Sequence, residues 1–578
     1  MSAGKQNRDR HIVAVDYVTG QMPFRERQAA EAHLADCQQC QTAVNALQSA
    51  QAQRRVRETT GALVNFATHM IQSGATLIAP SLRQLPDPAP APEPEPEPPT
   101  FEPLRVLLPH VTRGARYLLS RLGIVLALTV AVLLLPTPPG LSPEGHRALA
   151  AFVFTGGILA LEPVALPIAA LLVPVVLVGL GTATTPEAFE PFSRPVVFLI
   201  LASLFLAEAL RKHGLTRRLA LATIVMSGGG LRKLLLGLMG ITAAFSMWVG
   251  STATTAMLIP VALTISKQVP DPKEARGFLA LLGLGIVYSA SLGGMVTIMG
   301  ASANAVASGF LAQNQAWSFL DWMRYGLPSF LLMFPITWWL LLRLLPTSVE
   351  RLDVEPARQR VQKLGKWSQA EREIILTIAV AAFFWVTGSF LEPMLGLPPS
   401  LLSAAMVAVI AVGVLAVRQI INWEDVKGVS WGIFFIIGAG LALGEALSRT
   451  GATEWFAGLI GTAISGPPFI ISLLFLVYLS ALLTNLMNNT TIAAVFTPIL
   501  ISIALTNPEL SAVELVLPVT LATTFGYSLP SASARTGLLA ATGIVERGAM
   551  LRYGLIVTMV SSAVLGLFFY ALSILNWI

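Results

Sequence analysis

Apolar runs long enough to cross a bilayer recur along most of this chain. Residues 117–135, 277–299 and 555–575 are examples, and each approaches or exceeds the length that crosses about 30 Å of hydrocarbon. Of all 578 residues, 54% are hydrophobic and 12% are charged, which is too apolar for a soluble globule of this size. The sequence therefore predicts an all-α polytopic membrane protein with about 11 transmembrane helices. Several runs are too short to cross and adjoin small polar residues, which predicts re-entrant hairpins or broken helices.

Two basic clusters beside apolar runs predict the orientation of the chain. Their members are Arg211, Lys212, Arg217 and Arg218 in the first, and Arg351, Arg358, Arg360, Lys363, Lys366 and Arg372 in the second. Lysine and arginine near span ends favour the cytoplasmic side. Residues 1–10 are polar and no apolar core follows them, so no cleavable signal is expected and the N-terminus is predicted to be cytoplasmic.

A proline-rich stretch divides the chain. Residues 85–103, "LPDPAPAPEPEPEPPTFEP", have the composition of an extended, semi-rigid spacer. We expect a small cytoplasmic domain over residues 1–55, an amphipathic helical segment over 56–84 and a membrane domain over 116–578. The amphipathic segment has two open interpretations, since its weak apolar face suits either a membrane surface or a protein partner.

Four small-polar runs interrupt the membrane domain in two matched pairs. "STATTAMLIP" at 251–260 matches "NTTIAAVFTP" at 489–498 in layout, and each is followed at a similar distance by a second run, at 300–309 and 530–539. Carriers often consist of two inverted halves with the binding site between them. Broken helices present free N–H groups that suit an anion, although small residues also line plain helix contacts. The matched pairs favour a carrier for a small anion.

The membrane domain resembles the divalent anion/sodium symporter family. The resemblance rests on the two tip sequences "SMWVGSTATTAMLIP" and "LLTNLMNNTTIAAVFTPIL". It implies a dimeric carrier in the bacterial inner membrane, in contact with lipid and without enzymatic activity. The substrate-binding residues that it implies are Ser251, Thr252, Asn489 and Thr490. We add Ser302, Ser533 and Arg535 as candidates, at positions after each tip where this chain departs from the family's Thr-Pro-Pro. The sodium-binding residues that it implies are Ser246, Gly250, Ser251, Gly300, Thr484, Asn488, Asn489 and Ala532.

Arg535 departs from the family pattern and allows two interpretations. A guanidinium at membrane depth is costly and is normally paired or aimed at a cavity. It either replaces a sodium ion beside the anion, in which case the carrier exchanges one anion for another, or it pairs with a membrane acid such as Glu162 or Glu445 or reaches an interface. We favour the first interpretation.

Both cysteines of the chain lie in the stretch "HLADCQQC" at residues 33–40. Cys37, Cys40 and His33 provide three ligands of a tetrahedral zinc site, and His11 is the expected fourth. A redox pair has the same Cys-x-x-Cys spacing. The whole of residues 11–40 resembles the zinc-finger domain of bacterial anti-sigma factors, which implies zinc as a cofactor and a sigma factor as a partner, with no direct contact to nucleic acid.

The sequence predicts a secondary transporter of small divalent anions, such as succinate, citrate or sulfate, that works by alternating access. Its alternative is a membrane-bound anion sensor that binds a sigma factor through the zinc domain. An enzyme is not expected, because no paired carboxylates, nucleophile–base set or phosphate-binding glycine loop stands out.

Overall fold

Prolines and short polar side chains mark where many of the helices begin. Pro143, Pro195 and Pro272 each occupy the first turn of a helix, where the missing N–H leaves no bond unmade. Ser318 and Ser368 close capping boxes with acidic residues of the first turn. These local signals divide the apolar chain into separate helices.

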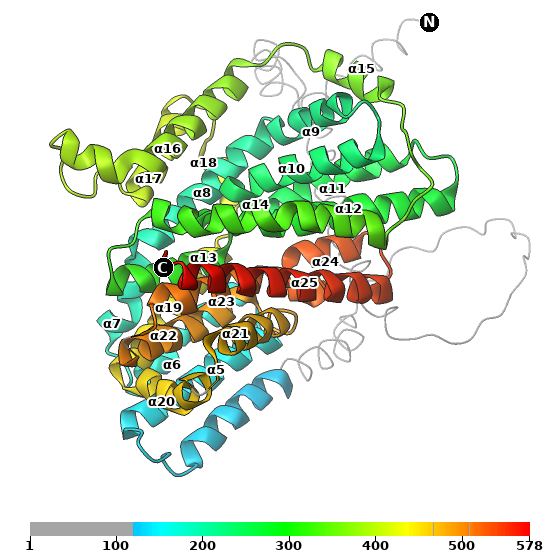
Figure 1. The fold of residues 1–578 in the computed structure, drawn as a ribbon. Coiled ribbons are helices and arrows are strands. Elements are labelled where there is room, and N and C mark those ends of the chain that lie inside the picture. Colours follow the sequence, from blue (N-terminus) through cyan, green and yellow to red (C-terminus); the bar gives the residue numbers. More distant parts are fainter. Residues whose placement is uncertain (1–119, 466, 508) are drawn as a thin grey trace, which may run out of the picture. The chain divides into compact units, whose positions relative to one another are not determined.

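The computed structural model describes residues 120–465, 467–507 and 509–578. These residues are helical apart from turns and one isolated β-bridge between Gly230 and Arg351 (Figure 1). The predicted zinc ligands, the amphipathic segment and the proline-rich spacer lie outside the described residues, so they stay predictions.

Two sets of helices succeed one another along the chain. The first contains Ser120–Leu134, α5 (Pro143–Leu161), α6 (Leu166–Gly179), α7 (Thr185–Phe189), α8 (Pro195–Lys212), α9 (Leu215–Met226), α10 (Leu231–Val249), α11 (Ser251–Ser266), α12 (Pro272–Gly294), α13 (Ser302–Asn314), α14 (Phe319–Leu344) and α15 (Glu355–Lys363). The second contains α16 (Gln369–Met394), α17 (Ala404–Val417), α18 (Trp423–Lys427), α19 (Gly432–Arg449), α20 (Ala452–Ser465), α21 (Phe469–Leu483), α22 (Asn489–Thr506), α23 (Ala512–Ala522), α24 (Ala534–Ala541) and α25 (Arg547–Ile574). Short 3₁₀ turns also occur: η1 (Glu190–Ser193), η2 (Ile298–Gly300), η3 (Thr523–Phe525) and η4 (Pro530–Ala532).

Seven of these helices are long and apolar enough to cross a membrane, or up to eight if the bent pair Thr185–Ser193 and Pro195–Lys212 forms one span. Six shorter apolar helices accompany them. The prediction of an all-helical polytopic chain is confirmed at this level.

Each of the four small-polar runs begins a new helix after a break. Gly250 separates α10 from α11, and residues 484–488 separate α21 from α22. The segments 295–301 and 523–533 separate α12 from α13 and α23 from α24. The prediction that these runs mark broken helices is therefore confirmed for the described chain.

The two sets of helices pack in matching ways and exchange contacts. Within the sets, α10 packs on α12 as α21 packs on α23, and α12 packs on α14 as α23 packs on α25. Between the sets, α6 packs on α19 while α17 packs on α8, and α14 lies beside α25 (Figure 1). Residues far apart in sequence are thereby held side by side.

In each set of helices, one glycine of a long helix lies very close to the backbone of a break. A Cβ on Gly326 of α14 would lie 2.7 Å from the carbonyl oxygen of Met295, and one on Gly554 of α25 would lie 2.4 Å from that of Tyr527. Neighbouring side chains, Trp322 and Thr558, donate hydrogen bonds to the unwound carbonyls of Met295 and Phe525. The long helices α14 and α25 thus stabilise the two breaks by the same means, since buried carbonyls need partners.

The two basic clusters lie on one face. Arg218 of α9 donates to the carbonyl oxygens of Leu364 and Gly365, which follow α15, and to a carboxylate oxygen of Glu371 at 2.7 Å. The bridge from Gly230 to Arg351 joins the same regions. The two clusters therefore lie close together in the described chain, while the side of the membrane that they face stays a prediction.

Candidate functional site

The first tip is the turn between α10 and α11. Gly250 has φ +83°, a conformation that residues with a Cβ rarely adopt. Ser251, the first residue of α11, is buried, whereas the next residue, Thr252, is exposed. Glycine suits this turn because it adopts a positive φ without the steric cost that a Cβ brings.

The second tip is the turn between α21 and α22. Asn488 caps α22, and its side-chain oxygen accepts a hydrogen bond from the backbone N–H of Thr490 at 2.9 Å. Asn489 is partly exposed, and its side-chain amide lies 2.5 Å from the Thr484 hydroxyl. Polar groups of the tip are thus held in place by one another.

Each tip contacts the broken helix of the other set. Thr490 of the second tip lies 2.5 Å, hydroxyl to hydroxyl, from Ser302 at the start of α13. Ser251 of the first tip accepts a hydrogen bond at 3.1 Å from Nη1 of Arg535 in α24. Four of the predicted substrate-binding residues therefore meet in two pairs.

Arg535 is buried without a carboxylate partner. Its exposed fraction is 3%, its Nη2 donates to the carbonyl oxygen of Thr524 at 2.7 Å, and its Nε has no hydrogen-bond partner in residues 120–465, 467–507 and 509–578. Among the described residues it forms no ion pair; Glu445 pairs instead with Arg194 at 2.9 Å, and no ion pair joins Arg535 to Glu162. The pairing of Arg535 with either acid is therefore excluded in this structure.

The remaining predicted residues lie beside the breaks. Ser246 donates to the carbonyl oxygen of Ala290 at 2.5 Å, and Thr484 donates to that of Thr523 at 2.7 Å. These are matching contacts from α10 to α12 and from α21 to the end of α23. Ser533 instead caps its own helix α24 through Thr536, so its hydroxyl is committed locally.

Gly300 and Ala532 close the two breaks differently. A Cβ on Gly300 would lie 2.3 Å from the carbonyl oxygen of Gly294, so no larger residue fits. Ala532 is 2% exposed and its Cβ lies 3.2 Å from the point where a Cβ on Gly526 would be. The second break has room for one methyl group that the first lacks.

The family model of the sodium:sulfate symporter transmembrane region matches residues 116–577. The chain belongs to this family. An uncharacterized transporter of Haemophilus influenzae is 30% identical over 431 residues, which cover 73% of this chain and 91% of the relative. The sodium-dependent dicarboxylate transporter SdcS of Staphylococcus aureus is 28% identical over 433 residues, which cover 70% of this chain and 82% of SdcS.

Among solved structures, the antimetabolite efflux pump MtrF of Neisseria gonorrhoeae superposes with a TM-score of 0.48 at 13% identity, over 77% of this chain and 97% of MtrF.

Two buried tyrosines that contact each other were not predicted. Tyr288 of α12 and Tyr527, which follows η3, are fully buried, with ring centroids 4.5 Å apart, and neither hydroxyl has a hydrogen-bond partner within the described part of the chain. One residue comes from each half of this symporter-family chain. In the sequence they are isolated tyrosines in apolar surroundings, and only the contact between α12 and η3 brings them together.

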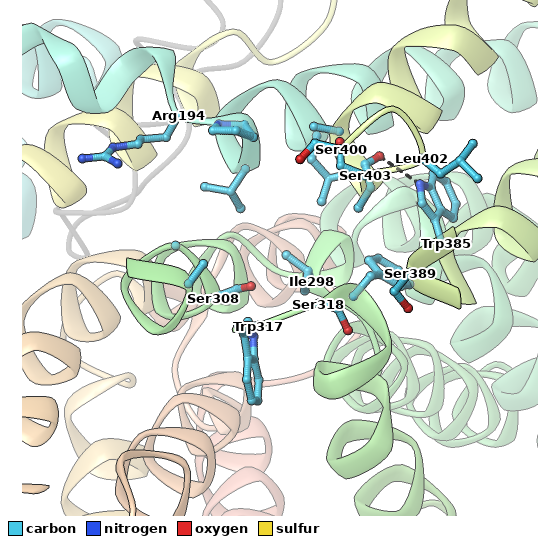
Figure 2. A pocket seen from close by; sticks show the side chains of 18 of the residues that line it. Arg194, Ile298, Ser308, Trp317, Ser318, Trp385, Ser389, Ser400, Leu402 and Ser403 are labelled. Atoms are coloured by element: carbon cyan, nitrogen blue, oxygen red, sulfur yellow. Dashed lines mark hydrogen bonds between the residues drawn. The ribbon is translucent and has the colours of Figure 1, made fainter. Parts of the chain in front are cut away.

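A cavity of about 440 Å³ lies apart from the tips, between α8, α13 and α14 and the pair α16 and α17. Figure 2 shows the hydroxyls of Ser308, Ser389 and Ser403 around it, with Trp385 donating to the carbonyl oxygen of Ala404. None of the tip residues lines it. α13 runs from Ser302, the first residue of the helix, to the wall of this cavity.

Proposed function

We propose that this symporter-family protein is a secondary transporter of small divalent anions, namely di- and tricarboxylates such as succinate or citrate, or sulfate, working by alternating access. Family membership and the likeness to SdcS, a sodium-dependent dicarboxylate transporter, support this proposal. In the proposed arrangement the matched halves form an inverted repeat in the bacterial inner membrane, with two re-entrant hairpins and about 11 transmembrane helices.

The anion is proposed to bind between the tips, on Ser251, Thr252, Asn489 and Thr490, with Ser302, Ser533 and Arg535 beside them. Arg535 is the observation that carries the proposal. Burying an unpaired charge is costly, and a bound anion would offset that cost. The planar guanidinium suits a carboxylate or a sulfate, each of which presents two oxygens to it.

The charge of Arg535 also bears on whether transport is coupled to sodium or to a second anion. A carrier with a permanent cation beside its anion needs less positive charge from bound ions, so we propose that it exchanges one anion for another. The competing mode is sodium symport through the oxygens around Ser246, Gly250 and Gly300 at the first tip and Thr484, Asn488 and Ala532 at the second. The likeness to SdcS favours that mode.

Uptake by the purified protein in liposomes distinguishes the two modes. Labelled succinate, citrate and sulfate are supplied outside, with and without a sodium gradient and with and without unlabelled anion inside. We expect uptake that requires internal anion and is indifferent to sodium. Uptake driven by sodium into empty liposomes would overturn exchange while retaining transport, and no uptake of any of the three anions would contradict the proposed substrate class.

A further inference from the structure

A second cavity lies on the face of the two basic clusters. It has a volume of about 280 Å³ and is enclosed by α9, α11 and α15, which pack on one another through α9. Its lining residues on the α11 side run from Met257 to Gln268. The cavity therefore adjoins the middle and the end of α11, the helix that begins at the first tip with Ser251.

Two arginines of this cavity are unpaired. Arg217 of α9 and Arg360 of α15 both line it, both are exposed, and neither forms a hydrogen bond or an ion pair with the described residues. Their neighbours differ, since Arg211, Lys212 and Arg218 all pair with carboxylates. No acidic side chain of the part of the chain that the structure describes lines the cavity, so the charge that these residues give it is positive and uncompensated.

The wall of the cavity is apolar, and one hydrogen-bond acceptor without a partner lies among its lining residues. Leu221 and Ile224 of α9 face Met257, Val261 and Ile265 of α11 across it. Another lining residue, Gln268, has a buried side-chain oxygen with no hydrogen-bond partner. An occupant that fits would combine an anionic group, a hydroxyl or amine donor and a hydrocarbon chain.

We propose that this cavity binds one anionic phospholipid of the inner leaflet. Its phosphate lies between Arg217 and Arg360, a headgroup hydroxyl such as that of phosphatidylglycerol donates to Gln268, and an acyl chain follows the apolar wall. Basic pockets between helices on the cytoplasmic side suit anionic headgroups. A small free anion would satisfy the arginines but would leave the apolar wall uncovered. Bound lipid would hold α11 against α9 and α15 and so limit the movement of α11, which begins at the first tip.

Native mass spectrometry of the full-length protein in detergent tests this site, with phosphatidylglycerol and phosphatidylcholine as probes. We expect retained phosphatidylglycerol and little phosphatidylcholine. The double variant R217Q/R360Q is expected to weaken phosphatidylglycerol binding by roughly tenfold or more, because each basic residue near an anionic surface contributes severalfold. The control R351Q/K363Q removes the same charge from the same basic face outside the cavity, and is expected to change binding by less than about twofold.

A third variant distinguishes lipid binding inside the cavity from general attraction of the lipid to the basic surface. T264W fills the cavity without changing the charge, and we expect it to displace the lipid as the double arginine variant does. Equal losses in R217Q/R360Q and R351Q/K363Q, or full binding by T264W, would overturn the site. Displacement of the lipid by millimolar inorganic phosphate or succinate would identify a small-anion site instead. None of these readouts depends on transport, so the result stands apart from the proposed function.

Discussion

The two contacts between tips and broken helices have matching positions and different chemistry. Thr490 meets Ser302 through two neutral hydroxyls, whereas Ser251 meets the guanidinium of Arg535. The matched packing of the two halves therefore does not make the two sides of the site equivalent, since only one carries a fixed charge. This asymmetry is the basis for the charge-dependent part of the proposed function.

The largest effect is expected from Arg535→Gln, which removes that asymmetry. We expect anion uptake to fall by about a hundredfold or more, the loss typical of deleting a buried charged hydrogen-bond partner. Because Arg535 has no carboxylate partner, its removal leaves no opposite charge unpaired, so the melting temperature should stay the same or rise. Uptake in liposomes and thermal unfolding of the same preparation check both parts.

Arg218→Gln is the matched control for a buried arginine. Arg218 is 8% exposed and pairs with Glu371, which is itself buried. Removing it leaves that carboxylate unpaired, and we expect a loss of stability of about 3 kcal/mol or more. If Arg535→Gln destabilised the protein as much and Arg218→Gln abolished uptake without unfolding it, the two arginines would have the opposite roles.

Gly300→Ala tests whether the two breaks tolerate the same change. The added Cβ would overlap the Gly294 backbone, so we expect a loss of about 1–3 kcal/mol in stability together with reduced uptake. The counterpart Ala532→Gly should cost roughly 1 kcal/mol or less, because it removes one methyl group and clashes with nothing. Melting temperatures of the two variants make the comparison, and equal losses would show that the second break is as tightly packed as the first.

Removing the neutral contact should have a smaller effect. Ser302→Ala and Thr490→Val each delete one hydroxyl of the pair, with an expected loss of roughly 0.5–1.5 kcal/mol in the apparent affinity for the anion, or threefold to tenfold. The double variant should lose less than the sum, since both changes remove the same bond. Concentration-dependent uptake measures the coupling; strict additivity would mean that the two hydroxyls act independently on the anion.

The sequence predicted the broken helices and their pairing well, for a physical reason. Glycine, proline and hydroxyl residues act locally, so the runs at 251–260 and 489–498 mark helix starts whatever the rest of the chain does. Arg535 was named as a candidate from the sequence because it departs from the family motif and because a charged residue within an apolar region stands out. Its role in binding stays a prediction.

What the sequence left open depended on packing. It allowed Arg535 to pair with Glu445, and only the fold shows that Glu445 is taken by Arg194. Tyr288 and Tyr527 were missed because tyrosines in apolar helices are common and their contact joins the two halves. Likewise, nothing in the residue types predicts that Thr490 reaches Ser302 rather than another hydroxyl.

The smallest effect is expected from breaking a surface ion pair. This change tests whether transport depends on fixed charges other than that of Arg535. The hydrogen bond from Lys212 lowers the pKa of Asp425 from its ordinary value of 3.8. A lowered pKa in the folded state contributes stability that is fully present above the unfolded value and is lost as the pH falls through the folded value. Asp425→Asn should therefore lower the melting temperature at pH 7 by at most about 2 °C. This difference should shrink once the pH falls below the ordinary pKa and vanish below the lowered pKa of the folded state.

Thermal unfolding from neutral to acidic pH measures this difference, with Glu424→Gln as the control because Glu424 and its partner Lys427 are both exposed. Uptake at pH 7 should be unchanged in both variants, because neither charge lies near the tips. A loss of uptake in Asp425→Asn comparable to that in Arg535→Gln would mean that transport responds to charge anywhere on the helices. The contrast between the charged and the neutral tip contact would then no longer explain which side of the site holds the anion.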